Sequence, residues 1–197
     1  MSIQDHYKKL LLKYGDTAES AQYSDRSTQE RRFEILSEIA PLANQKILDF
    51  GCGTGHFASY LKHRNIPVEY TGVDIVEEFF DYGRKKLPEH RFGLLSEFGD
   101  ETFDYAFVSG VFNNKMDNNV QFYQDCLCDL FPRVKKGIAF NMMSTYVDYQ
   151  DEGLFYETPE RAFQFVKEQL TPLVNLRHDY RIKSGVVPFE FAIYAYK

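Results

Sequence analysis

The sequence predicts an α/β fold in which helices cover both faces of a mostly parallel, doubly wound β-sheet. From residue 46 onward, strand-like and helix-like segments alternate along the chain, which is typical of a parallel sheet. The last two strand-like segments follow each other without a helix between them. Because a short connection can join only antiparallel neighbours, the sheet is expected to end in an antiparallel hairpin.

Residues 1–45 are polar and helix-prone, and we expect them to form a helical cap in front of a domain of residues 46–197. Apolar residues recur there at helical spacing in two stretches, which are separated by a break at Gly15-Asp16. The two stripes consist of Tyr7, Leu10, Leu11 and Tyr14, and of Phe33, Ile35, Leu36 and Ile39.

The alternating part begins with a strand at 46–50, which runs directly into the glycine-rich turn Gly51-Cys52-Gly53-Thr54-Gly55. A helical face follows this turn, and a second strand at 69–74 completes one βαβ unit. The further elements that we expect are a helix at 76–86, a weak strand near 91–92, a strand at 103–108, a helix at 120–131 and a strand at 136–141.

The end of the chain differs from this alternation. Thr158-Pro159-Glu160 combines an N-cap residue, a proline at the first helical position and an acidic first turn, which predicts a helix through about residue 170. Two β-rich segments follow, at 176–182 and 189–196, joined through Lys183-Ser184-Gly185. These two segments form the expected hairpin.

The composition favours a protein that acts on small molecules. Lys and Arg total 23 and Asp and Glu total 29, so the net charge of −6 repels phosphate backbones and argues against a nucleic-acid partner. The three cysteines form no CxxC pair, so neither a disulfide framework nor a zinc cage is indicated. No signal peptide or membrane-spanning run is found, and we expect a cytoplasmic monomer or homodimer.

The glycine-rich turn predicts a ligand site at the carboxyl ends of the strands. Glycine has no Cβ, so the backbone there can approach a ligand closely, and Asp74 after the second strand is placed to accept hydrogen bonds from two ribose hydroxyls. Both features occur in dinucleotide enzymes and in methyltransferases. His56 occupies the position where a dinucleotide fingerprint has glycine or alanine, and Asp49 suits an ammonium better than a pyrophosphate.

At these residues the chain resembles the class I S-adenosylmethionine-dependent methyltransferases. Residues 47–55 match the first motif of that family, and residues 70–75 match the second. The resemblance covers residues 45–197, and it implies a Rossmann-like sheet of seven strands whose last strand runs antiparallel. It also implies S-adenosylmethionine as the cofactor.

The resemblance carries the following cofactor contacts over to this chain. Asp49 is expected to hold the methionyl ammonium, Asp74 the ribose hydroxyls, and Ile75 to pack on the adenine opposite Leu94 or Leu95. In the cap, Arg32 is a candidate partner for the methionyl carboxylate. The other expected contacts come from Gly51, Cys52, Gly53, Gly55, Ser109, Gly110 and Val111.

The acceptor is less well defined by the sequence. The motif that enzymes use after the fourth strand to methylate exocyclic amines is missing, and no arrangement of acids for a divalent metal is found, so we expect a metal-independent enzyme for small molecules. The whole chain also resembles small bacterial methyltransferases that modify sugars, surface polysaccharides and natural products, and this resemblance favours O-methylation of a small hydroxylated molecule, such as a sugar or natural product. The candidates for catalysis are His178 as a general base on the sixth strand, Tyr146 and Asn113. The alternatives are a nicotinamide-dependent oxidoreductase and a cofactor-binding module without catalysis.

Overall fold

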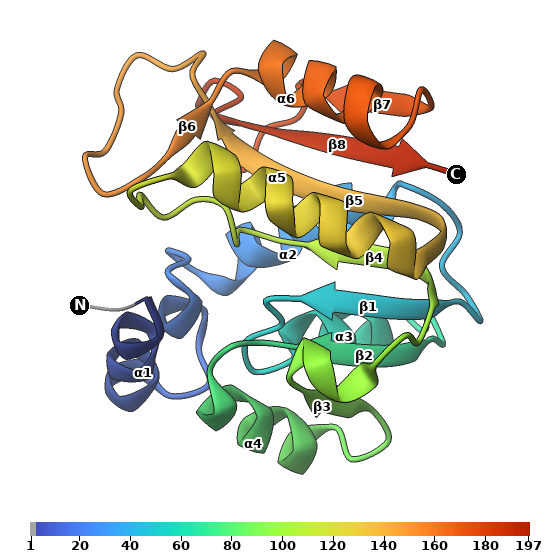
Figure 1. Ribbon diagram of the computed structural model, residues 1–197. Coiled ribbons are helices and arrows are strands. Elements are labelled where there is room, and N and C mark those ends of the chain that lie inside the picture. Colours follow the sequence, from blue (N-terminus) through green and yellow to red (C-terminus); the bar gives the residue numbers. More distant parts are fainter. Residues whose placement is uncertain (1–2) are drawn as a thin grey trace.

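The computed structural model describes residues 3–197 and contains one mixed β-sheet at its centre (Figure 1). Along the sheet the strand order is β3-β2-β1-β4-β5-β8-β7, and the short strand β6 pairs with the end of β5. The strands are β1 (Lys46–Phe50), β2 (Glu69–Val73), β3 (Arg91–Gly93), β4 (Phe103–Val108), β5 (Val134–Ser144), β6 (Tyr156–Glu157), β7 (Val174–Arg177) and β8 (Glu190–Tyr196).

The strand directions confirm the predicted fold class. Strands β1 to β6 pair in parallel, and β8 lies antiparallel between β5 and β7. Two details differ from the expectation. The pairing of β6 has no sequence signal, because it is two residues long, and β7 ends at Arg177, so residues 178–182 belong to the connection to β8 rather than to the sheet.

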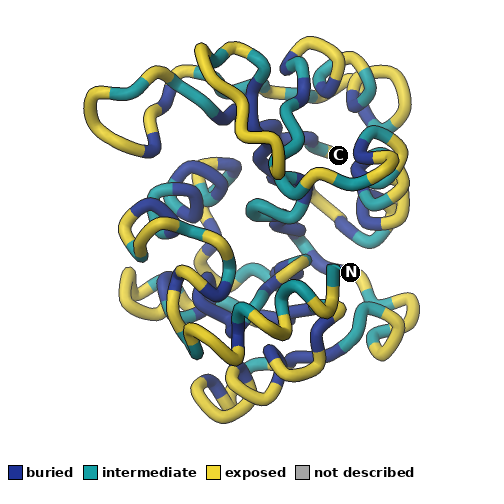
Figure 2. The backbone as a smooth tube through the Cα atoms, turned by 90° about the vertical axis from the view of Figure 1, so that its left-hand side faces the viewer, coloured by how far each residue is buried: buried dark blue, intermediate teal, exposed yellow. Residues whose placement is uncertain are grey.

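Helices cover both faces of the sheet. They are α1 (Ile3–Tyr14), α2 (Arg26–Ser37), α3 (His56–His63), α4 (Glu77–Lys86), α5 (Asn119–Leu130) and α6 (Pro159–Phe165), which continues as a π-helical turn over Val166–Leu170. Short 3-10 turns are Ala18–Ala21, Leu95–Phe98 and Phe131–Arg133. Figure 2 shows the buried stretches of the chain inside the molecule and the exposed ones around them.

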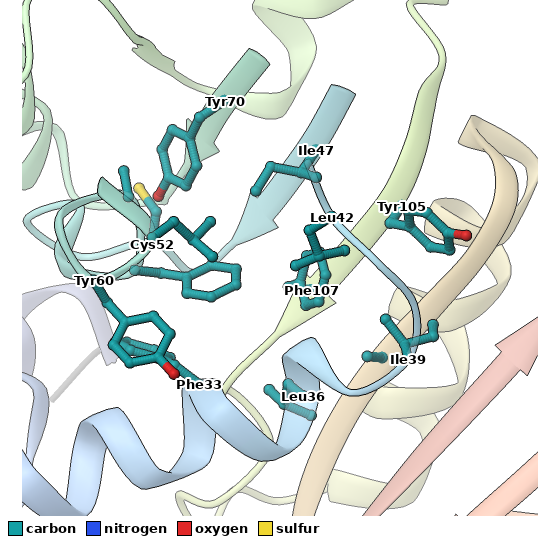
Figure 3. Close-up of a cluster of buried hydrophobic side chains, with 14 of the residues drawn as sticks. Phe33, Leu36, Ile39, Leu42, Ile47, Cys52, Tyr60, Tyr70, Tyr105 and Phe107 are labelled. Atoms are coloured by element: carbon teal, nitrogen blue, oxygen red, sulfur yellow. The ribbon is translucent and has the colours of Figure 1, made fainter. Parts of the chain in front are cut away.

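The alternation of side chains along β1 explains the two cores. Ile47 points to the face covered by α2, α3 and α4, whereas its neighbour Leu48 points to the face covered by α5 and α6. Figure 3 shows the first core, to which α2 contributes Phe33 and Leu36 and the sheet contributes Ile47 and Phe107. Ile47 and Leu48 are both fully buried, so a one-residue slip of β1 would place each of them in the other core.

The N-terminal segment divides into two parts. Helix α2 buries Phe33, Ile35 and Leu36 and is a layer of the domain itself. Helix α1 packs through Leu11 on Val76 and Phe79 at the start of α4, and its first residues with the turn 18–21 cover the edge of the sheet where β1 and β4 end (Figure 1). We call residues 3–25 the cap. The predicted cap of 1–45 begins two residues before the described part of the chain.

Among residues 3–197 there is no helix that combines the length and the apolar character needed to cross a membrane.

Candidate active site

A cavity of about 420 Å³ lies at the carboxyl ends of β1, β2 and β4, under the cap. The turn after β1 forms its floor, and the loops after β2, β3 and β4 form its sides. Residues of α1, of the turn 18–21 and of α2 close it from above. This position, where the strand order reverses between β1 and β4, is where open α/β sheets bind their ligands.

The three glycines of the turn after β1 have different functions. A Cβ on Gly51 would lie 2.3 Å from Cγ2 of Val111, and a Cβ on Gly55 would lie 2.7 Å from the ring of Phe92, so both positions allow close packing within the protein. At Gly53, which has φ +53°, a Cβ would have no neighbour within 4 Å. Gly53 therefore leaves space on the cavity side, where its backbone can approach a ligand.

Asp74 is held at the mouth of β2 by two backbone groups. The N–H of Gly53 donates to Oδ2 at 2.9 Å, and the N–H of Val76 donates to Oδ1 at 3.0 Å. Burial raises the pKa of Asp74, and these backbone hydrogen bonds oppose that shift. Each carboxylate oxygen keeps acceptor capacity, so the group can take two further hydrogen bonds from a ligand.

Asp49, near the end of β1, is 3% exposed and also lines the cavity. The hydroxyl of Tyr70 donates to its Oδ2 at 2.6 Å. Burial raises the pKa of Asp49 to about 7, although the Tyr70 hydrogen bond favours the charged form. A cation beside Asp49 would favour the ionised form of this carboxyl and would then pair with the carboxylate.

The cap is fastened to the glycine-rich turn by polar contacts. Asp16 accepts hydrogen bonds from the hydroxyl of Thr54 and, at 2.9 Å, from the ammonium of Lys86.

His56 contacts Glu30 of α2 at 2.9 Å. The burial of His56, together with the nearby charge of Arg26, lowers its pKa to about 4. The imidazole of His56 is thus neutral at physiological pH and serves this contact.

Arg26, which the sequence reasoning missed, is the one Lys or Arg among the described residues that line the larger cavity. Its guanidinium donates to the carbonyl of Asp16 at 3.2 Å and to Gln29 at 3.3 Å. A sequence signal for Arg26 was its position directly after Asp25, the N-cap of α2. An N-cap residue fixes the direction of the backbone in the first helical turn, and Arg26 belongs to that turn.

Arg32 lies elsewhere than the sequence-based expectation placed it. Its Nε contacts both carboxylate oxygens of Glu190 on β8, at 2.8 and 3.0 Å, and its Nη1 donates to the carbonyl of Thr28 at 3.0 Å. Glu190 is fully buried. The guanidinium is therefore already paired with a carboxylate of the protein and does not line the larger cavity.

The Arg32–Glu190 pair extends into a network that reaches the loop after β4. Asn141 of β5 donates to Glu190 at 3.1 Å, and its Oδ1 accepts the backbone N–H of Gly110 at 2.9 Å. The ring of Tyr23 stacks 4.8 Å from the Arg32 guanidinium. The network therefore ties the cap to β5, β8 and the site loop.

A smaller cavity of about 240 Å³ adjoins the larger one. Tyr7, Ala21, Tyr23, Gly110 and Asn114 line both of them. The boundary is tightest at Gly110, which has φ +73° and whose Cβ would lie 2.3 Å from the hydroxyl of Tyr23. The same hydroxyl lies 3.3 Å from the carbonyl of Ser109, so Tyr23 forms a common wall.

Of the three candidates for catalysis, the structure brings only Asn113 to a cavity, the smaller one. His178 follows the end of β7, and its Nε2 lies 3.2 Å from the carbonyl of Pro188. Tyr146 is 58% exposed and donates to Glu160 at 2.5 Å. His178 and Tyr146 approach each other, with ring centroids 5.9 Å apart, but neither lines either cavity.

Of the remaining expected cofactor residues, all except Gly55, which packs against Phe92, line the larger cavity. Ile75, Leu94 and Leu95 supply apolar surface on the side of β2 and β3, and Ile75 is 48% exposed. Cys52, Ser109, Gly110 and Val111 lie on the side of β1 and β4. No three His, Cys, Asp or Glu side chains within residues 3–197 converge as they would around a metal ion.

Comparisons with known proteins agree with this arrangement. A family model for a methyltransferase domain matches residues 48–127. The Mycobacterium tuberculosis protein Rv1506c, whose name gives it provisionally as a methyltransferase, is 26% identical over 155 residues, which are 75% of this chain and 90% of that protein. A tRNA (guanine-N(7)-)-methyltransferase from Clostridium botulinum is 27% identical over 45% of this chain and 41% of its own length.

The fold is also similar to that of a solved methyltransferase. The structure of magnesium protoporphyrin IX methyltransferase from Synechocystis with bound S-adenosylmethionine superimposes with a TM-score of 0.67 at 10% identity, covering 100% of this chain and 98% of that one. The fold, the site and the sequence matches together define a Rossmann-like transferase. These findings support a class I S-adenosylmethionine-dependent methyltransferase.

Proposed function

We propose that the protein transfers the methyl group of S-adenosylmethionine, bound in the larger cavity, to a small hydroxylated acceptor, such as a sugar or natural product, bound in the smaller cavity. The observation that carries this proposal is the common wall of the two cavities at Tyr23 and Gly110. Methyl transfer from a sulfonium is an in-line displacement, so the two reactants must meet across one short boundary.

On the cofactor side, the contacts described above support specific roles. Asp74 accepts the ribose hydroxyls with the lone pairs that Gly53 and Val76 leave free. Ile75 and the leucines after β3 pack on the adenine. Asp49 holds the methionyl ammonium, because a buried carboxyl with a pKa of about 7 gains most from an adjacent cation.

Arg26 takes the role that the sequence suggested for Arg32. Its guanidinium lies on the wall of the larger cavity. Two of its hydrogen bonds go to uncharged oxygens, the backbone carbonyl of Asp16 and the side-chain amide of Gln29. A guanidinium with neutral partners is free to pair with a carboxylate, whereas Arg32 already pairs with Glu190. We therefore assign the methionyl carboxylate to Arg26.

When bound, the cofactor supplies an electrophilic methyl group. The residues of this chain hold the acceptor near it and exclude water, since the cap closes the larger cavity from above. No Asp, Glu or His is among the described residues that line the smaller cavity. Asn113 and Asn114 offer amide groups there, which orient an acceptor hydroxyl. As the acceptor oxygen bonds to the methyl carbon, the bond from that carbon to sulfur breaks and S-adenosylhomocysteine is left, while the hydroxyl proton passes to solvent water.

We expect a small acceptor because the smaller cavity has a volume of only about 240 Å³ and is lined by the cap and the loops after β4 and β7. Some relatives act on nucleic acid, as the name of the Clostridium botulinum enzyme states. The net charge of −6 disfavours such a partner here, because a phosphate backbone is attracted by clustered basic residues.

Calorimetric titration tests the cofactor side. Wild-type protein is titrated with S-adenosylhomocysteine and, in parallel, with NADH, and saturable binding of S-adenosylhomocysteine alone is expected. Asp74→Ala should weaken this binding by on the order of 10- to 100-fold, since two hydrogen bonds to a charged group are lost. Asp129→Ala, which removes an exposed acid of α5, is the matched control and should bind like wild type. Preferential binding of NADH, or unchanged affinity in Asp74→Ala, would contradict the assignment.

The acceptor side is tested by turnover. S-Adenosylmethionine carrying a labelled methyl group is incubated with the enzyme and fractions of a small-molecule extract. Label in a product below about one kilodalton supports the proposal. Consumption of S-adenosylmethionine that depends only on added RNA or protein would contradict it.

A further inference from the structure

The smaller cavity has an unbalanced set of charges. Its charged lining residues are two cations, Arg32 and Lys183, and no carboxylate of the described chain lines it. The whole protein carries a net charge of −6, so this local sign is opposite to that of the surrounding molecule. Because Glu190 pairs with Arg32, the charge that an anion meets in this cavity is that of Lys183.

The two cations differ in what they can offer to a ligand. Arg32 is 8% exposed at the base of the cavity, and Glu190 neutralises it. Lys183 lies in the exposed connection between β7 and β8 and forms no ion pair within the described residues. The charge of Lys183 acts on the carboxylate of Asp25. The pKa of Asp25 is lowered to about 2, mainly by the hydrogen bond from Ser27, and Lys183 makes the smallest contribution to this shift. Its ammonium therefore remains available at the mouth of the cavity.

An uncharged group on another wall also lacks a partner. The Oδ1 atom of Asn113 is buried and accepts no hydrogen bond in the described chain. A buried carbonyl oxygen without a donor costs about 1–3 kcal/mol, and such atoms usually have a partner in the functional state. The side-chain amide can turn about its last torsion, so it can present either its oxygen or its nitrogen to the cavity that it lines.

We propose that the acceptor is a small hydroxylated anion, whose carboxylate or phosphate group binds Lys183 and whose hydroxyl donates to Asn113. This inference rests on the proposed function, since it assigns the acceptor class to the smaller cavity. Lys183 belongs to the connection before β8, and Asn113 belongs to the loop after β4, so two distant parts of the sequence line the same cavity. Together they select for a molecule that carries both groups.

The proposal predicts a measurable preference between matched ligands. D-Glucuronate and D-glucose differ by a carboxylate in place of a hydroxymethyl group, and D-glucose 6-phosphate carries a phosphate instead. We expect the two anions to bind at least about tenfold more tightly than glucose to the protein loaded with S-adenosylhomocysteine, the size of one charge-assisted contact. The preference should shrink as the salt concentration rises.

Heteronuclear NMR titration provides a readout that does not depend on turnover. Bound anion should shift the backbone amide of Gly110 and the side-chain amide of Asn113, which line the cavity. Lys183→Gln should reduce the preference for the anions over glucose to about twofold or less. Lys85→Gln, which removes an exposed lysine of α4, is the matched control and should keep it.

Three results would overturn the proposal. They are equal binding of glucuronate, glucose 6-phosphate and glucose, an unchanged anion preference in Lys183→Gln, and the absence of shifts at Gly110 and Asn113 with both anions. If either anion alone is preferred, the proposal stands and the source of the charge is identified as carboxylate or phosphate. Binding of S-adenosylhomocysteine is measured on the same samples, so a failure of the acceptor assignment is distinguished from a failure of the proposed function.

Discussion

The two cavities of the site are built from different kinds of sequence information. The floor of the larger cavity consists of the turn after β1 and Asp74. Asp74 accepts a hydrogen bond from Gly53, which lies 21 residues away in the sequence. The smaller one is bounded by residues of the cap, of the loop after β4 and of the connection before β8. Contacts there join residues as far apart as Arg32 and Glu190, which are separated by 158 positions. Local motifs therefore reveal the first cavity, whereas only the folded chain reveals the second.

The largest test of this difference removes one side of the long-range network. Arg32→Met leaves the fully buried carboxylate of Glu190 without its cation, and we expect the free energy of unfolding to fall by about 3–5 kcal/mol. The double variant Arg32→Met/Glu190→Met removes both charges and should recover most of that loss. Denaturant unfolding of the two variants and the wild type measures it. A double variant as unstable as the single one would contradict the explanation by an unpaired charge.

A smaller effect is expected at the common wall. Gly110→Ala places a Cβ 2.3 Å from the hydroxyl of Tyr23, at a position with φ +73°. Overpacking of this kind costs about 1–3 kcal/mol, and displacement of Tyr23 should weaken the binding of ligands in both cavities. Calorimetry with S-adenosylhomocysteine and NMR with glucuronate report the two sites separately. An effect confined to one cavity would show that Tyr23 does not form a common wall.

The pH dependence of cofactor binding tests the larger cavity alone. Because Asp49 has a pKa of about 7, the fraction of its carboxylate increases between pH 6 and pH 8. If this carboxylate holds the methionyl ammonium, the affinity for S-adenosylhomocysteine should rise over that interval, by up to about tenfold. Asp49→Asn should bind more weakly at pH 8 and should flatten the profile. A wild-type profile that is flat or falls with pH would exclude this role.

The same carboxyl also affects stability, with the opposite sign. Its pKa is raised in the folded protein, so between its unfolded value near 4 and about 7 the folded state binds more protons than the unfolded state. The contribution of Asp49 to the free energy of unfolding is therefore fully present at about pH 4 and is lost as the pH rises to 7. Asp49→Asn should remove this part of the pH dependence.

The smallest effect is expected outside both cavities. His178→Ala should change the affinities for S-adenosylhomocysteine and glucuronate by less than about twofold, because its Nε2 meets the carbonyl of Pro188 and its ring packs near Tyr146 and Phe191. Methyl transfer to the identified acceptor should continue at a similar rate. A large loss of turnover would restore His178 as a general base.

The sequence predicted the elements whose causes are local. The strand at 46–50, the glycine-rich turn and Asp74 follow from hydrophobic pattern and motif, and the structure contains the strands at those positions. The same pattern did not reveal which arginine faces the cofactor cavity. Arg26 and Arg32 lie six residues apart on α2, and their different surroundings depend on Glu190, which a distant strand supplies. Lys183 gave no signal because its position depends on how β7 and β8 connect.

The wall formed by Tyr23 and Gly110 has a thermodynamic consequence. Any occupant that presses on this wall from one side changes the free energy of occupancy on the other side, since the same side chain lines both cavities. Linkage requires the coupling to be reciprocal, so a cofactor that strengthens acceptor binding by some factor is itself retained more tightly by that same factor once the acceptor is present.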